Sequence, residues 1–64
     1  MDERDIWRSA KRFVDLYGDN ATIHAVMRHG KLLEQGDMDG TAAWRQIITA
    51  IEELQNMEPS GAVH

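Results

Sequence analysis

The sequence contains no cysteine, and proline occurs only once, at Pro59. Without cysteine the chain can form neither a disulfide framework nor a thiolate metal site, which fits a reducing compartment. No stretch approaches the roughly 18 consecutive apolar residues that a transmembrane helix requires. The chain begins with charged residues, mostly acidic, where a secretory signal would carry a basic region followed by an apolar one. We therefore expect a cytoplasmic protein with no membrane partner.

Basic residues are also scarce, because 7 Lys and Arg stand against 11 Asp and Glu, giving a formal net charge of -4. Binding to nucleic acid generally requires a surplus of positive charge to neutralise phosphates, so this balance makes nucleic acid an unexpected partner. A chain of 64 residues forms one domain at most. A domain of this size buries only about 60% of the surface that its unfolded chain exposes. Its stability is therefore marginal, which favours self-association or a protein partner.

The sequence does have helical periodicity, in three segments separated by Gly18 and Gly36. The first segment covers residues 3–17, with Asp2 as the expected N-cap and Gly18 as the expected left-handed residue after its end. Its apolar side chains repeat at the spacing of one helix face: Ile6, Trp7, Ala10, Phe13, Val14 and Tyr17. A basic stripe lies opposite that face and consists of Arg4, Arg8, Lys11 and Arg12.

The second segment covers residues 20–35, with Asp19 as its expected N-cap, and it is apolar on two sides. Its main stripe consists of Ile23, Val26, Met27, Gly30 and Leu33. A smaller stripe on nearly the opposite side consists of Ala21, Ala25 and Leu32. A helix that is apolar on two sides normally lies between two partners. Because Gly30 has no side chain, it would let another helix approach the main stripe closely.

The third segment covers residues 38–56, and Asp37 or Asp39 is its expected N-cap. Its apolar face consists of Trp44, Ile47, Ile48, Ile51 and Leu54. The short connections favour antiparallel neighbours. The sequence therefore predicts an all-α protein, a three-helix bundle packed up, down and up or with the third helix crossing at an angle. This single domain would cover residues 1–56, followed by a disordered, flexible tail over 57–64.

Residues that could carry out chemistry are few and poorly spaced. His24 and His29 lie about 140° apart around a helix, so they cannot hold one ion as an i, i+4 pair can. The sequence GDMDG at 36–40 resembles the start of a calcium loop, but the twelfth position counted from Asp37 is Ile48, where that loop requires glutamate. The chain also lacks a glycine-rich phosphate loop and a strained nucleophile elbow. We therefore predict a non-enzymatic protein with no metal, no cofactor and no small-molecule substrate.

Candidate interaction residues come from three features of the sequence. The smaller stripe of the second helix either receives the third helix or binds a partner. The two tryptophans either pack in the core or anchor a partner at its rim. The basic stripe of the first helix is either a solvated face or a surface for an acidic partner. The resulting candidate surface is Ala21, Ala25, Leu32, Trp7, Trp44, Arg4, Arg8, Lys11 and Arg12.

The segment GDMDGTAAWRQIITAIEELQ, residues 36–55, resembles the C-terminal part of a family of short uncharacterised bacterial proteins. In that family a glycine-aspartate turn precedes a helix with a tryptophan, isoleucine-type positions and an acidic end. The earlier segments DIWRSAKRFVDLYGDNA and HAVMRHGKLLEQ are similar to the same arrangement, so the resemblance covers residues 5–55. It implies a bacterial, cytoplasmic, all-helical protein. The family carries no assigned activity, so the resemblance implies no site residues.

Three functional hypotheses follow from the sequence. The first is a small protein-protein interaction module that forms a homodimer or binds one partner protein. The second is a small acidic inhibitor, of the anti-defence type, of a nucleic-acid-handling protein, in which the acidic residues among 52–58 compete for a basic groove. The third is a helix-turn-helix-like DNA binder, in which Thr41, Arg45 and Gln46 would read base edges.

Overall fold

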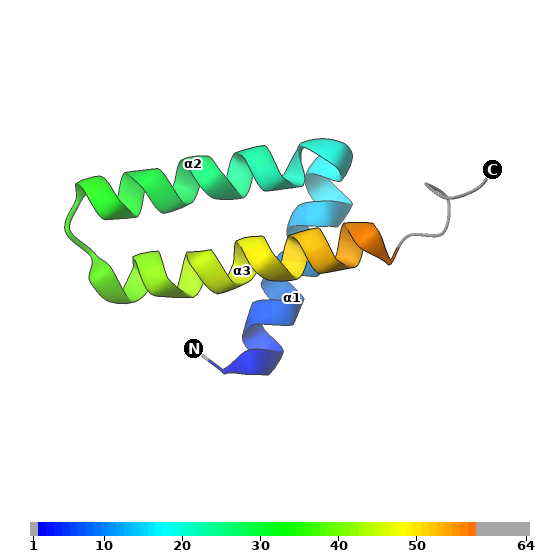
Figure 1. The fold of residues 1–64 in the computed structure, drawn as a ribbon, viewed down its shortest axis with the longest axis horizontal. Coiled ribbons are helices and arrows are strands. Elements are labelled where there is room, and N and C mark those ends of the chain that lie inside the picture. Colours follow the sequence, from blue (N-terminus) through cyan, green and yellow to red (C-terminus); the bar gives the residue numbers. More distant parts are fainter. Residues whose placement is uncertain (1, 58–64) are drawn as a thin grey trace.

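The structure is a computed structural model and describes residues 2–57. These residues form three α-helices and no strand: α1 is Glu3–Tyr17, α2 is Ala21–Glu34 and α3 is Met38–Asn56 (Figure 1). A short 3-10 helix, η1, covers Gly18–Asn20. The all-α prediction is thus confirmed for this part of the chain, and each helix limit lies within one residue of its predicted position. Met57 ends α3 in a turn, and the rest of the predicted flexible tail lies outside the described residues.

The helix ends follow from the residues that flank them. Gly18 and Gly36 have φ angles of +56° and +77°, in the left-handed region that glycine adopts without steric cost. The Asp37 side chain caps α3, because its Oδ1 accepts a hydrogen bond of 2.9 Å from the backbone N–H of Gly40. The N-cap of α2 is Asn20 and not the predicted Asp19, and its side chain makes no capping hydrogen bond. The extra 3-10 turn moves the start of α2 beyond Asp19.

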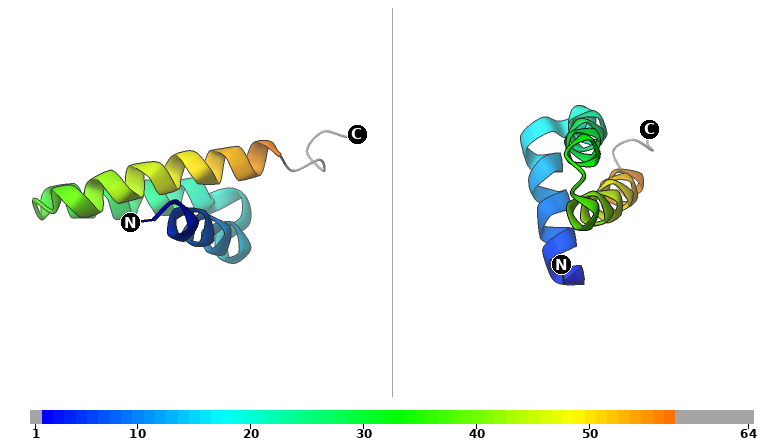
Figure 2. Two further views of the ribbon diagram at one scale, coloured as in Figure 1. Left: turned by 90° about the horizontal axis from the view of Figure 1, so that it is seen from below. Right: turned by 90° about the vertical axis from the view of Figure 1, so that its left-hand side faces the viewer.

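The helices do not form the predicted up-down-up bundle. α2 and α3 lie side by side and antiparallel, joined by the short turn at 35–37, and α1 lies across them at the end away from that turn (Figures 1 and 2). It is therefore the first helix that crosses at a steep angle, where the sequence analysis considered a crossing only for the third. The 3-10 turn after α1 redirects the chain between α1 and α2. A bundle with three nearly parallel axes is not confirmed.

Small side chains dominate the core where the three helices meet. The buried apolar residues are Ile6, Ala10, Ala21, Ala25, Ile47, Ala50 and Ile51, of which four are alanine. Helices pack about 8–10 Å apart depending on the side chains at the contact, so alanines favour a close crossing. Larger side chains surround this centre and are only half-buried: Trp7, Phe13, Val14, Trp44, Ile48 and Leu54.

A polar contact ties the end of α3 to the connection between α1 and α2. The side-chain N–H of Gln55 donates to the carbonyl oxygen of Gly18 at 3.1 Å, and its side-chain oxygen accepts a hydrogen bond of 3.3 Å from the Thr22 hydroxyl. These residues are far apart in the sequence, and the contact links the C-terminal end of α3 to η1 and to the start of α2.

Candidate protein-interaction surface

The structure buries the smaller apolar face of α2. Ala21 and Ala25 are both 0% exposed, because this face lies against α1 and α3. Leu32, the third residue of that stripe, is half-buried. Ala21 and Ala25 are therefore core residues of this fold, in keeping with the alternative that the smaller stripe receives another helix of the same chain. Their small side chains let α1 pack closely where it crosses, whereas the opposite face of α2 has the larger apolar side chains.

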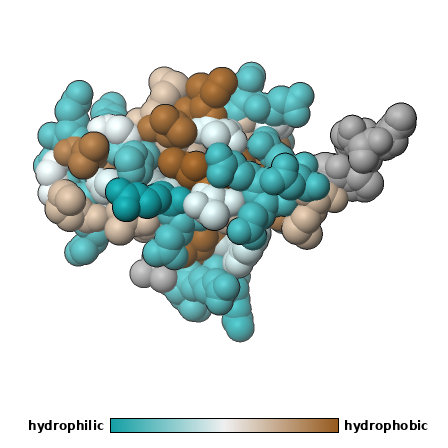
Figure 3. Space-filling model, in the orientation of Figure 1, coloured by the Kyte–Doolittle hydropathy of each residue, from teal (hydrophilic) through white to brown (hydrophobic). Residues whose placement is uncertain are grey.

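The main apolar stripe of α2 consequently points away from the core. Ile23 is 60% exposed, Val26 50%, Met27 65% and Leu33 52%. Gly30 lies among them, and a Cβ atom built on it would meet nothing within 4 Å. We call Ile23, Val26, Met27, Gly30 and Leu33 the outer stripe. Apolar side chains gather over α2 in the surface view (Figure 3).

Such a stripe differs from ordinary exposed apolar residues. Single apolar side chains on a protein surface are common, whereas contiguous apolar patches mark interaction sites. The outer stripe follows the i, i+3, i+4, i+7 spacing of one helix face over three turns of α2. It therefore forms an apolar ridge that is interrupted at Gly30. The periodicity of the sequence identifies this stripe, but its residues were not among the candidate interaction residues.

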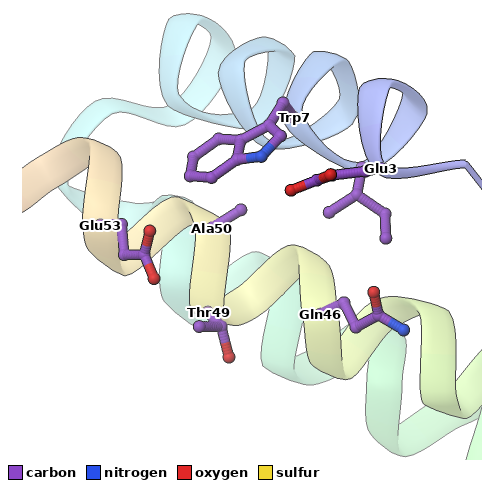
Figure 4. A pocket seen from close by; sticks show the side chains of 7 residues that line it. Glu3, Trp7, Gln46, Thr49, Ala50 and Glu53 are labelled. Carbon is purple, nitrogen blue, oxygen red and sulfur yellow. The ribbon is translucent and has the colours of Figure 1, made fainter.

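Trp7 lines a cleft of about 240 Å³ between α1 and α3. Its indole lies above Ala50, and the carboxylates of Glu3 and Glu53 lie on the two sides of the cleft (Figure 4). The Thr49 hydroxyl at this cleft donates a hydrogen bond of 3.2 Å to the carbonyl oxygen of Arg45. Small-molecule sites usually have volumes of about 300–1,000 Å³. The cleft is therefore small, and Trp7 is half-buried against the core.

Trp44 belongs to an aromatic cluster that links all three helices. His24 stacks on Tyr17 with ring centroids 3.8 Å apart, and Tyr17 meets Phe13 edge-on at 5.2 Å. Phe13 contacts Trp44 at 5.0 Å, and the guanidinium carbon of Arg28 lies 5.5 Å from the centroid of the Trp44 ring. Both tryptophans are thus half-buried at the rim of the core.

Sequence reasoning missed this cluster. The i, i+4 spacing of Phe13 and Tyr17 on one helix, and of His24 and Arg28 on the next, is the signal that predicts two facing pairs. A cleft of about 230 Å³ lies beside it and reaches Met27 of the outer stripe. The cluster therefore packs His24 and Arg28 of α2 against α1 and α3, and the outer stripe stays exposed.

The basic stripe of α1 is solvated. Arg4, Arg8, Lys11 and Arg12 are all exposed. Lys11 forms an ion pair of 3.4 Å with Asp15 one turn further along the helix. An exposed pair of this kind contributes about 0.2–0.5 kcal/mol. The stripe lies on a different helix from the outer stripe and has no apolar side chains among its four members.

The residues of the helix-turn-helix-like hypothesis do not all reach the surface of α3. Thr41 is buried and its hydroxyl donates to the carbonyl oxygen of Asp37 at 2.7 Å, so it cannot reach a base edge. Arg45 and Gln46 of the same helix are exposed. Within the described residues there is no group of three or more His, Cys, Asp or Glu side chains that could hold a metal ion. None of the helices in that part of the chain is long and apolar enough to cross a membrane.

Comparison with protein-family models, with curated proteins and with solved structures found no match to this chain. The resemblance to short bacterial helical proteins therefore stays a prediction.

Proposed function

We propose that this protein is a small non-enzymatic interaction module that binds another protein chain through the outer stripe of α2. The observation that carries the proposal is the exposure of four large apolar side chains on one face of one helix. They are four of the eight large apolar side chains that are exposed in the described residues, and they lie opposite the alanines that face the core.

Burial of the outer stripe would supply the driving force for binding. Complete burial of a large aliphatic side chain contributes about 1.5–3 kcal/mol, so covering the exposed half contributes about 1 kcal/mol for each of the four. Amphipathic helices bind partners in this way, with anchors at i, i+3, i+4 and i+7 that enter a groove or pack on another helix. The stripe presents anchors of this kind at Ile23, Val26 and Met27, and Gly30 leaves a gap at i+7.

Site-specific photo-crosslinking tests the proposal. A photoreactive amino acid replaces Ile23 in one variant and Leu16 in a control variant, because these residues are 60% and 61% exposed but lie on different helices. Irradiation in cells of the source organism should give a protein adduct from position 23 and little or none from position 16. If position 23 gives no adduct above the level of position 16, the outer stripe is not a protein-binding surface.

A further inference from the structure

We propose that the chain bound by the outer stripe is a second copy of this protein, with the two α2 helices packed antiparallel about a two-fold axis. The inference rests on the proposed function and identifies its partner. Three features of α2 support a second copy: the symmetry of the stripe, the gap at Gly30 and the charges at the two helix ends.

In an antiparallel pair of α2 helices, the outer stripe of one copy is complementary to the outer stripe of the other. Ile23 and Leu33 lie at equal distances on either side of position 28. In an antiparallel pair centred there, Ile23 of one copy meets Leu33 of the other, and Val26 meets Gly30. Because a Cβ atom on Gly30 would meet nothing within 4 Å, its place is open to the Val26 side chain of the second copy. A two-fold interface requires this reciprocity, in which one patch serves both copies.

In a parallel pair of α2 helices, the same residues would pack less closely. Gly30 would then face Gly30 of the second copy, and the gap between the helices would stay unfilled. Ile23 of one copy would face Ile23 of the other, so no large side chain would lie opposite a small one. The antiparallel arrangement therefore gives the closer packing.

The charges at the ends of α2 favour the same direction. Glu34 lies at the C-terminal end of α2, where a negative charge is unfavourable to the helix dipole. The first turn of α2 contains no acidic residue, and Asn20 makes no side-chain capping hydrogen bond. An antiparallel pair centred on position 28 brings Glu34 beside residue 22 of the second copy, in that first turn. Each copy would then supply the negative charge that the other copy's helix start lacks.

The size of the stripe predicts a weak, reversible dimer. One helix face with four large side chains per copy gives an interface at the lower end of the range, below about 1,200 Å² in total. Such interfaces belong to transient complexes. We therefore expect monomer and dimer to exchange rapidly, with dimer dominant only at high protein concentration.

Sedimentation equilibrium of the full chain tests self-association. The average mass should rise from the monomer value of 7.3 kDa toward twice that value as concentration increases from micromolar to millimolar. Met27→Asp should weaken dimerisation at least tenfold, whereas Leu16→Asp, a matched control on α1, should leave it unchanged. Met27 is 65% exposed and Leu16 61%, so neither substitution disturbs the core. A monomer at millimolar concentration, or equal weakening by both substitutions, would overturn the proposal.

Cysteine crosslinking tests the antiparallel direction, and the absence of native cysteine leaves no competing thiol. At a rise of about 1.5 Å per residue, two copies of position 23 in the antiparallel pair lie about 15 Å apart along the helices. That distance is too long for a disulfide, whose Cα atoms lie about 4.4–6.8 Å apart. Mixing Ile23→Cys with Leu33→Cys should therefore give the mixed disulfide in excess over either symmetric one. Preferential formation of the symmetric disulfide by Ile23→Cys alone would contradict the antiparallel arrangement.

The two proposals fail in different ways. Adducts from position 23 that contain a different protein, from a chain that stays monomeric, would overturn the second copy as partner and keep the interaction surface. Absence of both adducts and dimer would remove both proposals.

Discussion

Enlarging the buried face of α2 should destabilise the protein, whereas changing its exposed face should not. Ala25 is fully buried in the core where α1 crosses α2 and α3. Ala25→Leu replaces a methyl group by a four-carbon side chain, and the crossing helices leave it no space. Overpacking of this kind costs about 1–3 kcal/mol.

The matched changes are Met27→Gln on the outer stripe and Ala42→Leu at an exposed position of α3. Methionine and glutamine have similar helix propensities, and an exposed substitution usually changes the free energy of unfolding by less than about 0.5 kcal/mol. Ala42→Leu makes the same chemical change as Ala25→Leu but places the larger side chain in solvent. Both controls should leave the stability of the monomer almost unchanged.

Thermal unfolding followed by circular dichroism measures the difference. A loss of about 2 kcal/mol corresponds to a fall in Tm of roughly 10 °C for a domain of this size. The measurement uses dilute protein, so that association through the outer stripe does not add to the apparent stability. If Met27→Gln lowers the Tm as much as Ala25→Leu, the large apolar stripe faces the core and the assignment of the two faces is wrong.

Three further substitutions test local features of the fold. Asp37→Ala removes the side-chain cap of α3 and should lower the free energy of unfolding by about 1 kcal/mol. Urea denaturation measures this loss, and an unchanged midpoint would contradict the capping role. Gln55→Ala removes the contact with the Gly18 carbonyl and should also cost about 1 kcal/mol; a loss below about 0.3 kcal/mol would show that this contact does not stabilise the fold. Gly30→Ala should stabilise the dilute monomer by up to about 1 kcal/mol, because alanine is the better helix former and its Cβ has open space. A destabilised monomer would mean that Gly30 is covered by other residues of the same chain.

The helix limits could be predicted from the sequence because they depend on local chemistry. Glycines at 18 and 36 adopt positive φ angles, and Asp37 caps the helix that follows it. These signals act over a few residues, so a reading of the chain is enough to find them. The start of α2 was placed one residue early, since nothing in the sequence indicates the 3-10 turn that precedes it.

The inward face of α2 could not be predicted, because it depends on contacts between helices. Periodicity identifies two apolar faces on this helix but does not show which of them faces the core. Apolar area favours burial of Val26 and Met27, whereas the close crossing of α1 favours the alanines at 21 and 25. Contacts between distant residues are also hidden from a local reading, as with Gln55, which lies more than 30 residues from its hydrogen-bond partners. The basic stripe of α1, in contrast, lies on a solvated face, as one of its two expected alternatives has it. Both tryptophans are half-buried at the rim of the core.

The central claim is that the outer stripe of α2 is where this chain meets another copy of itself. Backbone amide shifts in NMR spectra, recorded from micromolar to millimolar protein, test this claim most directly. The account predicts concentration-dependent shifts for Ile23, Val26, Gly30 and Leu33, and none for the exposed basic residues of α1. Shifts confined to α1 or α3, or spectra that do not change with concentration, would contradict it.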